Sequence, residues 1–258
     1  MRIKLTLQCS KGSIIALNNR YELSAVLYKI LANADKDFAT WLHDRGYGKD
    51  GRQFKLFTFG FLQTFPYYKV DGGQVCKSGL VTWEASLCVD ELVQHIVTGL
   101  FRDASFVLKA GFFEEVHFKV QNVEILPLPN FTETMQYRCQ TPILIGQKRE
   151  ASKYETYLSP LDANYAALFL YNLRGKVKAV QGDSFQDSDT VSFRLLSAPD
   201  KVRPKGFKVY KQGIAPLTYK PYLFDFELIA PPEWQKIGYL AGFGQDGALG
   251  LGMCNVII

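Results

Sequence analysis

Three histidines give this chain few candidates for proton transfer, and His43 is the strongest of them. Histidine suits general acid–base chemistry because its ordinary pKa of about 6.5 lies near neutral pH. His95 is expected on the polar face of a helix and His117 on the outward face of a strand, which predicts surface positions for both. His43 instead falls where a predicted helix ends, and three glycines follow it within eight residues. It is therefore our candidate for a catalytic residue.

The residues near His43 could supply the other parts that metal-free cleavage of a phosphodiester needs. A base removes a proton from the attacking hydroxyl, an acid protonates the leaving oxygen, and a cation stabilises the crowded phosphorane. Near His43 lie hydroxyl and cationic side chains, namely Tyr28, Tyr47, Arg45, Lys49 and Arg52. No carboxylate or cysteine cluster has the spacing of a metal site, so we expect neither a metal nor another cofactor.

A glycine-rich segment, Gly238 to Gly252, precedes the short apolar run at the C-terminus. Glycine is used where the backbone needs a positive φ or lies against another backbone. A dinucleotide fingerprint would need a further helix, strand and acid, for which too few residues follow, and a Walker loop would need a lysine. We expect the backbone of this loop to approach an anionic ligand, and a glycine-rich hairpin that closes a sheet is the alternative. The glycines given this binding role are Gly242, Gly244, Gly247, Gly250 and Gly252.

The segment G-Y-L-A-G-F-G-Q-D-G-A-L-G-L-G-M-C-N-V-I-I resembles the C-terminal loop and strand of the repeat-associated RNA-binding proteins of CRISPR systems, most of all the sixth Cas protein family. That family consists of endoribonucleases that cut the CRISPR precursor transcript within each repeat. Its members typically place a histidine just after the first helix, and the best-known arrangement adds a tyrosine 15 residues before it and a lysine six residues after it. Tyr28, His43 and Lys49 have both spacings, so the resemblance implies that they are catalytic.

The resemblance also implies a reaction and a set of partners. The reaction is metal-independent: the 2′-hydroxyl attacks, leaving a cyclic phosphate and a 5′-hydroxyl, and the products are guide RNAs. The partner is CRISPR repeat RNA, as the precursor and as the processed guide, and a CRISPR effector complex or a homodimer is left open. One alternative is a non-catalytic RNA-binding subunit of an effector complex, which would not need His43. A more remote one is a ferredoxin-like protein that binds only protein partners.

Basic residues cluster in the second half of the chain, although the net charge of +5 is modest. Lysine and arginine that neutralise phosphates supply most of the sequence-independent affinity for nucleic acids. Each cluster could instead be a solvated strand face or turn, so the binding role is a hypothesis. The predicted RNA-binding cations are Lys148, Arg149, Arg174, Lys176, Lys201, Arg203, Lys205, Lys208 and Lys211.

Composition is that of an ordinary globular protein, with 47% hydrophobic and 21% charged residues. No apolar run approaches the length of a membrane helix, and the N-terminus alternates polar and apolar residues rather than forming a signal peptide. The five cysteines are scattered and form no C-x-x-C pair. We therefore expect a cytoplasmic protein with reduced thiols and no membrane partner.

Hydrophobic periodicity predicts an α+β protein made of two tandem ferredoxin-like (RRM-like) domains, at 1–126 and 127–258, the second ending in the glycine-rich loop. In the first, the order is β-α-β-β-α-β, with the catalytic residues at the end of the helical region. Its predicted strands are 2–8, 54–65, 79–89 and 116–126, and its predicted helices are 21–33, 36–44 and 90–102. Pro127 and Pro129 mark the linker. The second half has predicted strands at 137–146, 190–197, 205–212 and 219–230, a helix at 160–174, and a short helix after Pro231.

Overall fold

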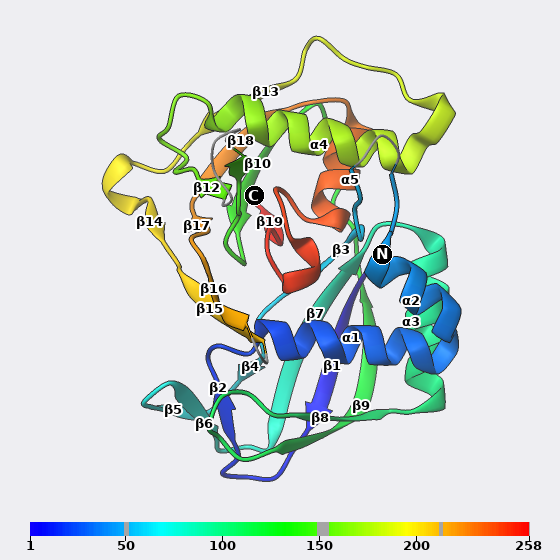
Figure 1. Ribbon diagram of the computed structural model, residues 1–258, viewed down its shortest axis with the longest axis vertical. Coiled ribbons are helices and arrows are strands. Elements are labelled where there is room, and N and C mark those ends of the chain that lie inside the picture. The colour runs from blue at the N-terminus through cyan, green and yellow to red at the C-terminus, as the bar shows by residue number, and fades with distance from the viewer. Residues whose placement is uncertain (49–51, 149–154, 212–213, 258) are drawn as a thin grey trace. The chain divides into compact units, whose positions relative to one another are not determined.

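The computed structural model describes residues 1–48, 52–148, 155–211 and 214–257 (Figure 1). These residues divide into two compact units, each built on an antiparallel sheet with helices. The first unit comprises Met1–Gly46 and Phe59–Leu128, and the second comprises Tyr47–Thr58 and Pro129–Ile258. The sequence places the domain boundary after residue 126. The structure adds that the segment Tyr47–Thr58, early in the sequence, groups with the second unit.

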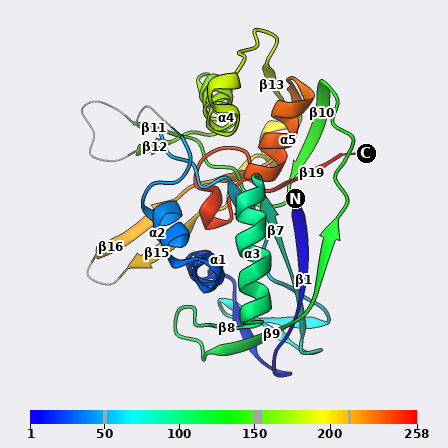
Figure 2. The same ribbon diagram turned by 90° about the vertical axis from the view of Figure 1, so that its right-hand side faces the viewer.

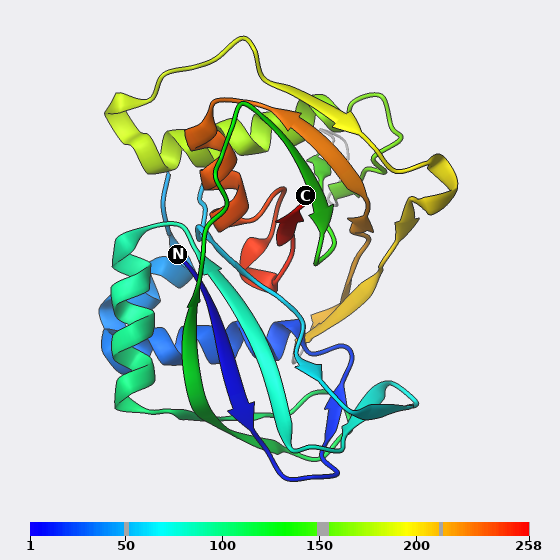
Figure 3. The same ribbon diagram turned by 180° about the vertical axis from the view of Figure 1, so that it is seen from behind.

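The first unit is a ferredoxin-like fold, which confirms the predicted β-α-β-β-α-β order. Its main sheet runs β3-β7-β1-β9-β8, and β4 also pairs with β7. Of the three residues of β3, Phe59 groups with this unit, and Phe57 and Thr58 group with the second. The main strands are β1 (Arg2–Gln8), β3 (Phe57–Phe59), β4 (Gln63–Thr64), β7 (Leu80–Leu87), β8 (Ser105–Leu108) and β9 (Val116–Leu126). The helices are α1 (Arg20–Ala34), α2 (Lys36–Asp44) and α3 (Asp90–Arg102). Seen from behind, the sheet lies in front of α1 and α3, so both helices cover the same face (Figure 3).

Alternation along β1 explains the core of the first unit. Ile3, Leu5 and Leu7 are buried, as the period of two predicts. β1 pairs antiparallel with β7 on one side and with β9 on the other, and the register with β9 shifts between Thr6 and Leu7. Trp83 of β7 is fully buried, and its indole Nε1 donates to the Gly60 carbonyl at 3.1 Å.

Two details of the first half of the chain differ from the prediction. The expected strand 54–65 is divided into β3 and β4, and Leu56, just before β3, has a positive φ of 53°, which is not a strand conformation. A small sheet of β2 (Ile14–Ala16), β5 (Tyr67–Val70) and β6 (Gly73–Cys76) was not predicted. The β5–β6 turn has Asp71 and Gly72 between paired residues, and Gly72 has a φ of 67°.

The second unit repeats the plan with the order β13-β18-β10-β19 in its main sheet. The strands of that sheet are β10 (Thr134–Cys139), β13 (Ser192–Leu195), β18 (Asp225–Ile229) and β19 (Cys254–Val256). The helices are α4 (Tyr165–Gln181) and α5 (Pro232–Ala241), which lie beside each other (Figure 2). The shorter strands are β11 (Gly146–Lys148), β12 (Glu155–Tyr157), β14 (Arg203–Pro204), β15 (Phe207–Lys211), β16 (Ile214–Tyr219) and β17 (Tyr222–Leu223).

Aromatic side chains form the core of the second unit. Phe169 of α4 contacts Phe193 and Phe226 of the sheet with ring centroids 4.8 and 5.4 Å apart. Phe243, in the glycine-rich segment, stacks on Phe169 at 5.8 Å and lies 4.9 Å from Tyr137. The segment is therefore attached to the core by a buried ring, which adds packing free energy that a loop of glycines alone would lack.

Three predicted elements of the second unit are shifted. β10 ends at Cys139 instead of 146. The helix begins at Tyr165 instead of 160, because Asp162 accepts a hydrogen bond from the Ser159 amide at 2.7 Å in a preceding turn. It continues to Gln181 and ends at Gly182, which has a positive φ. The expected strand 219–230 consists of β17 and β18.

Candidate functional site

Tyr28 and His43 lie on two consecutive helices of the first unit, α1 and α2. Asp35 separates the helices and caps α2, since its carboxylate accepts a hydrogen bond from the Phe38 amide at 2.8 Å. Phe38 and Leu42 are buried, so α2 packs against the rest of the protein through one apolar face. His43 comes directly after Leu42 and lies on the exposed side, in the last turn of α2.

The rings of Tyr28 and His43 are in contact. Their centroids are 5.2 Å apart, with an angle of 77° between the planes, which is an edge-to-face geometry. The His43 side chain is 69% exposed, and its Nδ1 lies 2.9 Å from Oδ1 of Asp44. A carboxylate at one ring nitrogen orients an imidazole for proton transfer. Asp44 was not among the predicted site residues, although a carboxylate next to a candidate histidine was visible in the sequence.

Burial raises the pKa of the Tyr28 hydroxyl well above its usual range. Tyr28 therefore stays protonated at neutral and moderately alkaline pH. Its hydroxyl can orient a substrate oxygen by hydrogen bonding, and it is unsuited to act as a general base. Within the pair, His43 is therefore the candidate for a general base.

Lys49, the third predicted catalytic residue, lies outside the described residues. Of the two arginines that could supply positive charge in its place, Arg45 is exposed at the C-terminus of α2. Arg52 belongs to the second unit, and its guanidinium stacks on the Tyr171 ring of α4 at 3.6 Å. The other two histidines have ordinary positions: His95 stacks on Phe38 at 4.2 Å, and His117 is exposed on β9.

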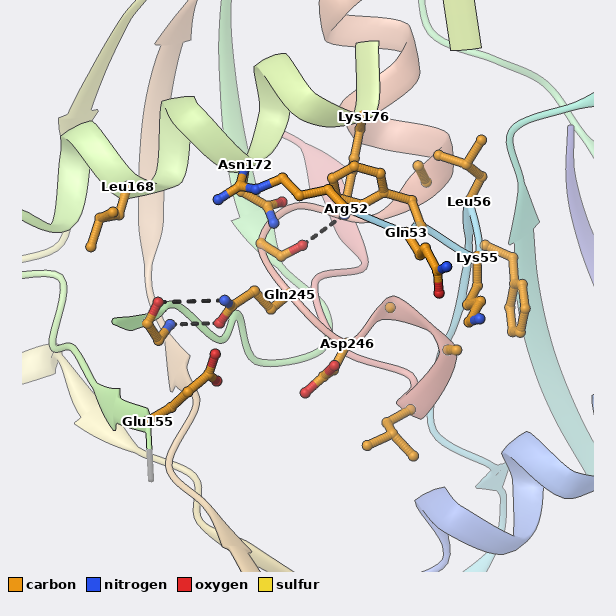
Figure 4. A pocket seen from close by; sticks show the side chains of 18 of the residues that line it. Arg52, Gln53, Lys55, Leu56, Glu155, Leu168, Asn172, Lys176, Gln245 and Asp246 are labelled. Carbon is orange, nitrogen blue, oxygen red and sulfur yellow. Dashed lines mark hydrogen bonds between the residues drawn. The ribbon is translucent and has the colours of Figure 1, made fainter. Parts of the chain in front are cut away.

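The second unit contains a pocket of about 770 Å³ between α4, the segment from Arg52 to Phe57 and the glycine-rich loop (Figure 4). Its wall combines cations with amides and two carboxylates. The polar and charged residues that line it are Arg52, Gln53, Lys55, Gln147, Lys148, Glu155, Asn172, Lys176, Gln245 and Asp246. Gln245 attaches the loop to β11, because its Oε1 accepts from the Gly146 amide at 2.6 Å and its Nε2 lies 3.4 Å from the Gly146 carbonyl oxygen.

Two carboxylates share this pocket. Burial raises the pKa of the Asp246 carboxyl, the nearby Glu155 carboxylate raises it further, and the Lys176 ammonium partly offsets both effects. Asp246 also has a left-handed backbone with a φ of 54°, a conformation that costs free energy outside glycine. Neither carboxylate was predicted as a site residue, since nothing in the sequence indicates that β12 and the loop lie together.

Backbone conformation and steric contacts within the protein explain why these loop positions are glycine. Gly242, Gly244, Gly250 and Gly252 have positive φ angles of 68° to 80°. A Cβ on Gly244 would lie 2.6 Å from the Leu144 carbonyl oxygen, and a Cβ on Gly247 would lie 2.6 Å from that of Phe57. These contacts explain the glycines by backbone approach within the protein. The predicted approach of an anionic ligand is thus not required to account for them, and it stays a prediction.

The predicted RNA-binding cations fall into two groups. Lys148, Lys201, Arg203, Lys205 and Lys208 are exposed in the second unit. Arg174 is half-buried and pairs with Asp187 at 2.6 Å, and Lys176 is buried beneath the glycine loop. Arg149 lies outside the described residues, as does the side chain of Lys211, whose backbone belongs to β15.

The described part of the chain contains neither a metal-ligand cluster nor a membrane-spanning helix. Within residues 1–48, 52–148, 155–211 and 214–257, no three His, Cys, Asp or Glu side chains gather where they could hold a metal ion. No helix in the same part of the chain has the length and apolarity to span a membrane.

Two curated proteins and a solved structure are similar to this chain over nearly its whole length. The chain is 27% identical to the CRISPR-associated endoribonuclease Cas6 1 of Methanocaldococcus jannaschii, over 98% of this chain and 91% of the relative. It is 23% identical to the CRISPR-associated endoribonuclease Cas6 of Pyrococcus furiosus, over 94% and 83%. The solved structure of the product of a Cas6-related gene from Pyrococcus furiosus matches with a TM-score of 0.80 and 20% identity, covering 100% of this chain and 98% of that one.

The family comparison covers the second half of the chain, including the glycine-rich loop. A family model described as CRISPR associated protein Cas6, C-terminal, matches residues 126–256, more than half of the 258 residues of the chain. The match includes both α4 and the glycine-rich segment that closes against it. As the resemblance of that segment implies, this chain belongs to the Cas6 family of CRISPR-associated proteins.

Proposed function

We propose that this protein is an endoribonuclease that cuts CRISPR precursor RNA within its repeats and so produces guide RNAs. The observation that carries the proposal is the Tyr28–His43 ring contact, with Asp44 at the histidine Nδ1, in a member of the Cas6 family. A non-catalytic RNA-binding subunit would have no need for this arrangement. The two curated relatives, which match nearly the whole of this chain, are endoribonucleases by name. This favours the enzyme over the non-catalytic subunit.

In the proposed reaction, a base takes the proton of the 2′-hydroxyl next to the scissile phosphate. The 2′-oxygen then bonds to phosphorus as the bond from phosphorus to the 5′-oxygen breaks. An acid delivers a proton to that leaving oxygen, so the products are a 2′,3′-cyclic phosphate and a 5′-hydroxyl. His43 carries out one of these two proton transfers. Tyr28 orients a reacting oxygen through its protonated hydroxyl, and Lys49 supplies positive charge to the phosphorane.

Binding is assigned to the second unit. The exposed cations Lys201, Arg203, Lys205 and Lys208 neutralise phosphates, and the glycine-rich loop contacts the RNA backbone. The partners beyond repeat RNA are a CRISPR effector complex that receives the product, or a second copy of the chain. The reaction takes place in the cytoplasm, where the precursor transcript is made.

The test uses purified protein and labelled repeat RNA in excess EDTA, resolved on denaturing and native gels. The proposal predicts cleavage at one position within the repeat. A shift on the native gel without cleavage would instead support the non-catalytic RNA-binding subunit. If the RNA is neither cleaved nor shifted, both functions are excluded and a protein-binding module remains.

A further inference from the structure

Lys176 is a buried cation at the centre of the second unit. It lies on α4 and is only 4% exposed. Its ammonium donates hydrogen bonds to two carbonyls of the glycine-rich loop, that of Gly242 and, at 2.7 Å, that of Gly244. Figure 4 shows the side chain reaching from the helix toward the loop. The sequence alone makes it one member of a basic cluster, and the structure separates it from that cluster.

A buried ammonium costs free energy unless hydrogen bonds replace its hydration. Here the compensation comes from the loop itself, because the Gly242 and Gly244 carbonyls both accept from Lys176. Those glycines have φ angles of 80° and 78°, which side-chain-bearing residues rarely adopt. The lysine and the loop conformation are therefore linked: the carbonyls need a donor, and the ammonium needs this unusual backbone.

We propose that Lys176 is a positioning residue for the glycine-rich loop. It holds the loop in its RNA-binding shape through the two carbonyls, and it does not itself neutralise a phosphate. This inference rests on the proposed function, since it assumes that the loop contacts RNA. It assigns to Lys176 a role different from that of the exposed cations, Lys205 and Lys208 among them.

Other bonds hold the loop at its edges. The Phe243 amide donates to the Gly252 carbonyl at 2.9 Å, and the Gln245 amide donates to the Leu144 carbonyl at 2.8 Å. Both are backbone–backbone hydrogen bonds. From α4, the Lys176 side chain reaches the same stretch and donates to the Gly242 and Gly244 carbonyls. Its removal should therefore loosen the loop while leaving the sheet in place.

The salt dependence of RNA binding separates the two roles. Losing a phosphate contact lowers the slope of log affinity against log salt by about 0.7 on a single strand. Lys176→Met should weaken repeat RNA binding about tenfold, as for lost hydrogen bonds to a charged group, with the slope unchanged. Lys178→Met is the matched comparison, because it removes one exposed positive charge from the same helix. A slope that falls by about 0.7 in Lys176→Met, or wild-type affinity in the folded variant, would overturn the proposal.

Two further measurements keep the test decisive if Lys176→Met fails to fold. Lys176→Arg keeps a charged donor and should retain binding within about threefold. In the wild-type protein, Lys176 should resist an amine-reactive label equally with and without repeat RNA. Labelling that is fast in the free protein and blocked by RNA would show direct contact and contradict the proposal.

Hydrogen exchange of the RNA-free protein tests the loop alone. The amides of Phe243 and Gln245 should exchange faster in Lys176→Met than in wild type, while those of β10 should not change. This outcome does not depend on RNA. If wild-type protein fails to bind repeat RNA but the loop amides lose protection, the proposed function fails and the structural link between Lys176 and the loop stands. Unchanged loop protection would refute that link.

Discussion

At the scale of single residues, the proposed chemistry depends on the exposure and the contacts of the His43 ring. Its ring is exposed, borders Tyr28 at 5.2 Å and has Asp44 at Nδ1. The helix α2 buries Phe38 and Leu42, while His43 lies in its last turn and is exposed. An exposed histidine with an oriented ring can reach a phosphodiester that no enclosed pocket would admit.

His43→Ala should lower the single-turnover cleavage rate by about 100-fold or more, as for the loss of a general acid or base. The dissociation constant for repeat RNA should stay within about twofold of wild type, because the predicted binding cations are elsewhere. His117→Ala is the control, since it removes another exposed histidine of the same unit. Cleavage at the wild-type rate by His43→Ala would refute the assignment.

Tyr28 gives a prediction about pH. Its pKa is raised by burial above the ordinary value of about 10, so the hydroxyl is protonated at every pH below that value. Tyr28→Phe should lower the cleavage rate by about three- to tenfold through one lost hydrogen bond. The pH–rate profiles of variant and wild type, from about pH 6 to about pH 10, should have the same shape. An alkaline change of rate that disappears in Tyr28→Phe would mean that Tyr28 ionises during the reaction.

At the scale of elements, the glycine-rich loop shows how local geometry sets residue choice. Gly244 combines a positive φ of 78° with a backbone oxygen, that of Leu144, where a Cβ would lie 2.6 Å away. Gly111 also has a positive φ, of 64°, but nothing lies within 4 Å of its Cβ position. The two positions thus differ in steric contact while both disfavour a side chain.

Gly244→Ala should lower the free energy of unfolding by about 2 kcal/mol more than Gly111→Ala, because only the first adds an overpacking cost to the backbone strain. Urea unfolding followed by circular dichroism measures the difference. Equal losses in both variants would show that backbone strain alone explains the glycine at 244, and that the loop yields easily to a side chain.

The sequence predicted most of the helices and strands because their burial is periodic. Ile3, Leu5 and Leu7 alternate in β1, and α3 begins at Asp90 and ends at Arg102 as expected. The β5–β6 hairpin was missed although Asp71-Gly72 is a strong turn signal. The start of α4 was misplaced because a side-chain-capped turn precedes it, and such a turn resembles a helix start in sequence.

The site was only partly predictable for a different reason. The resemblance places Tyr28 beside His43 by spacing alone, and the structure brings their rings together. The burial of Lys176 and the pairing of Arg174 with Asp187 depend on tertiary contacts that no local pattern encodes. A run of lysines and arginines indicates positive charge but does not reveal which of them faces solvent.

At the scale of the whole molecule, the two units have different chemical character. The first carries the Tyr28–His43 pair, and the second carries the exposed cations of β14 and β15 together with the glycine-rich loop. This division separates the predicted chemistry from the predicted binding. Variants of the second unit should therefore change affinity first and the cleavage rate of bound RNA less.

Replacing Arg203, Lys205 and Lys208 together with Ala should weaken repeat RNA binding. The slope of log affinity against log salt should fall by about 2, since each lost phosphate contact contributes about 0.7. The single-turnover rate at saturating protein should remain within a few-fold of wild type.

The matched control removes three exposed lysines of the first unit, Lys11, Lys36 and Lys69. It lowers the net charge by the same amount and should leave the slope unchanged. If both triple variants change the slope equally, the effect is one of net charge, and the β14–β15 surface is not the RNA-binding surface.

The central claim is cleavage by the RNA's own 2′-hydroxyl, and one substitution in the substrate tests it most directly. A repeat RNA with a single 2′-deoxy nucleotide just before the scissile bond lacks the nucleophile but keeps the backbone that the protein binds. In excess EDTA, wild-type protein should bind this RNA with unchanged affinity and leave it uncut, while the all-ribose RNA yields a 2′,3′-cyclic phosphate and a 5′-hydroxyl. Cleavage of the deoxy substrate at the same bond would mean that water is the nucleophile, and would contradict the mechanism assigned to His43.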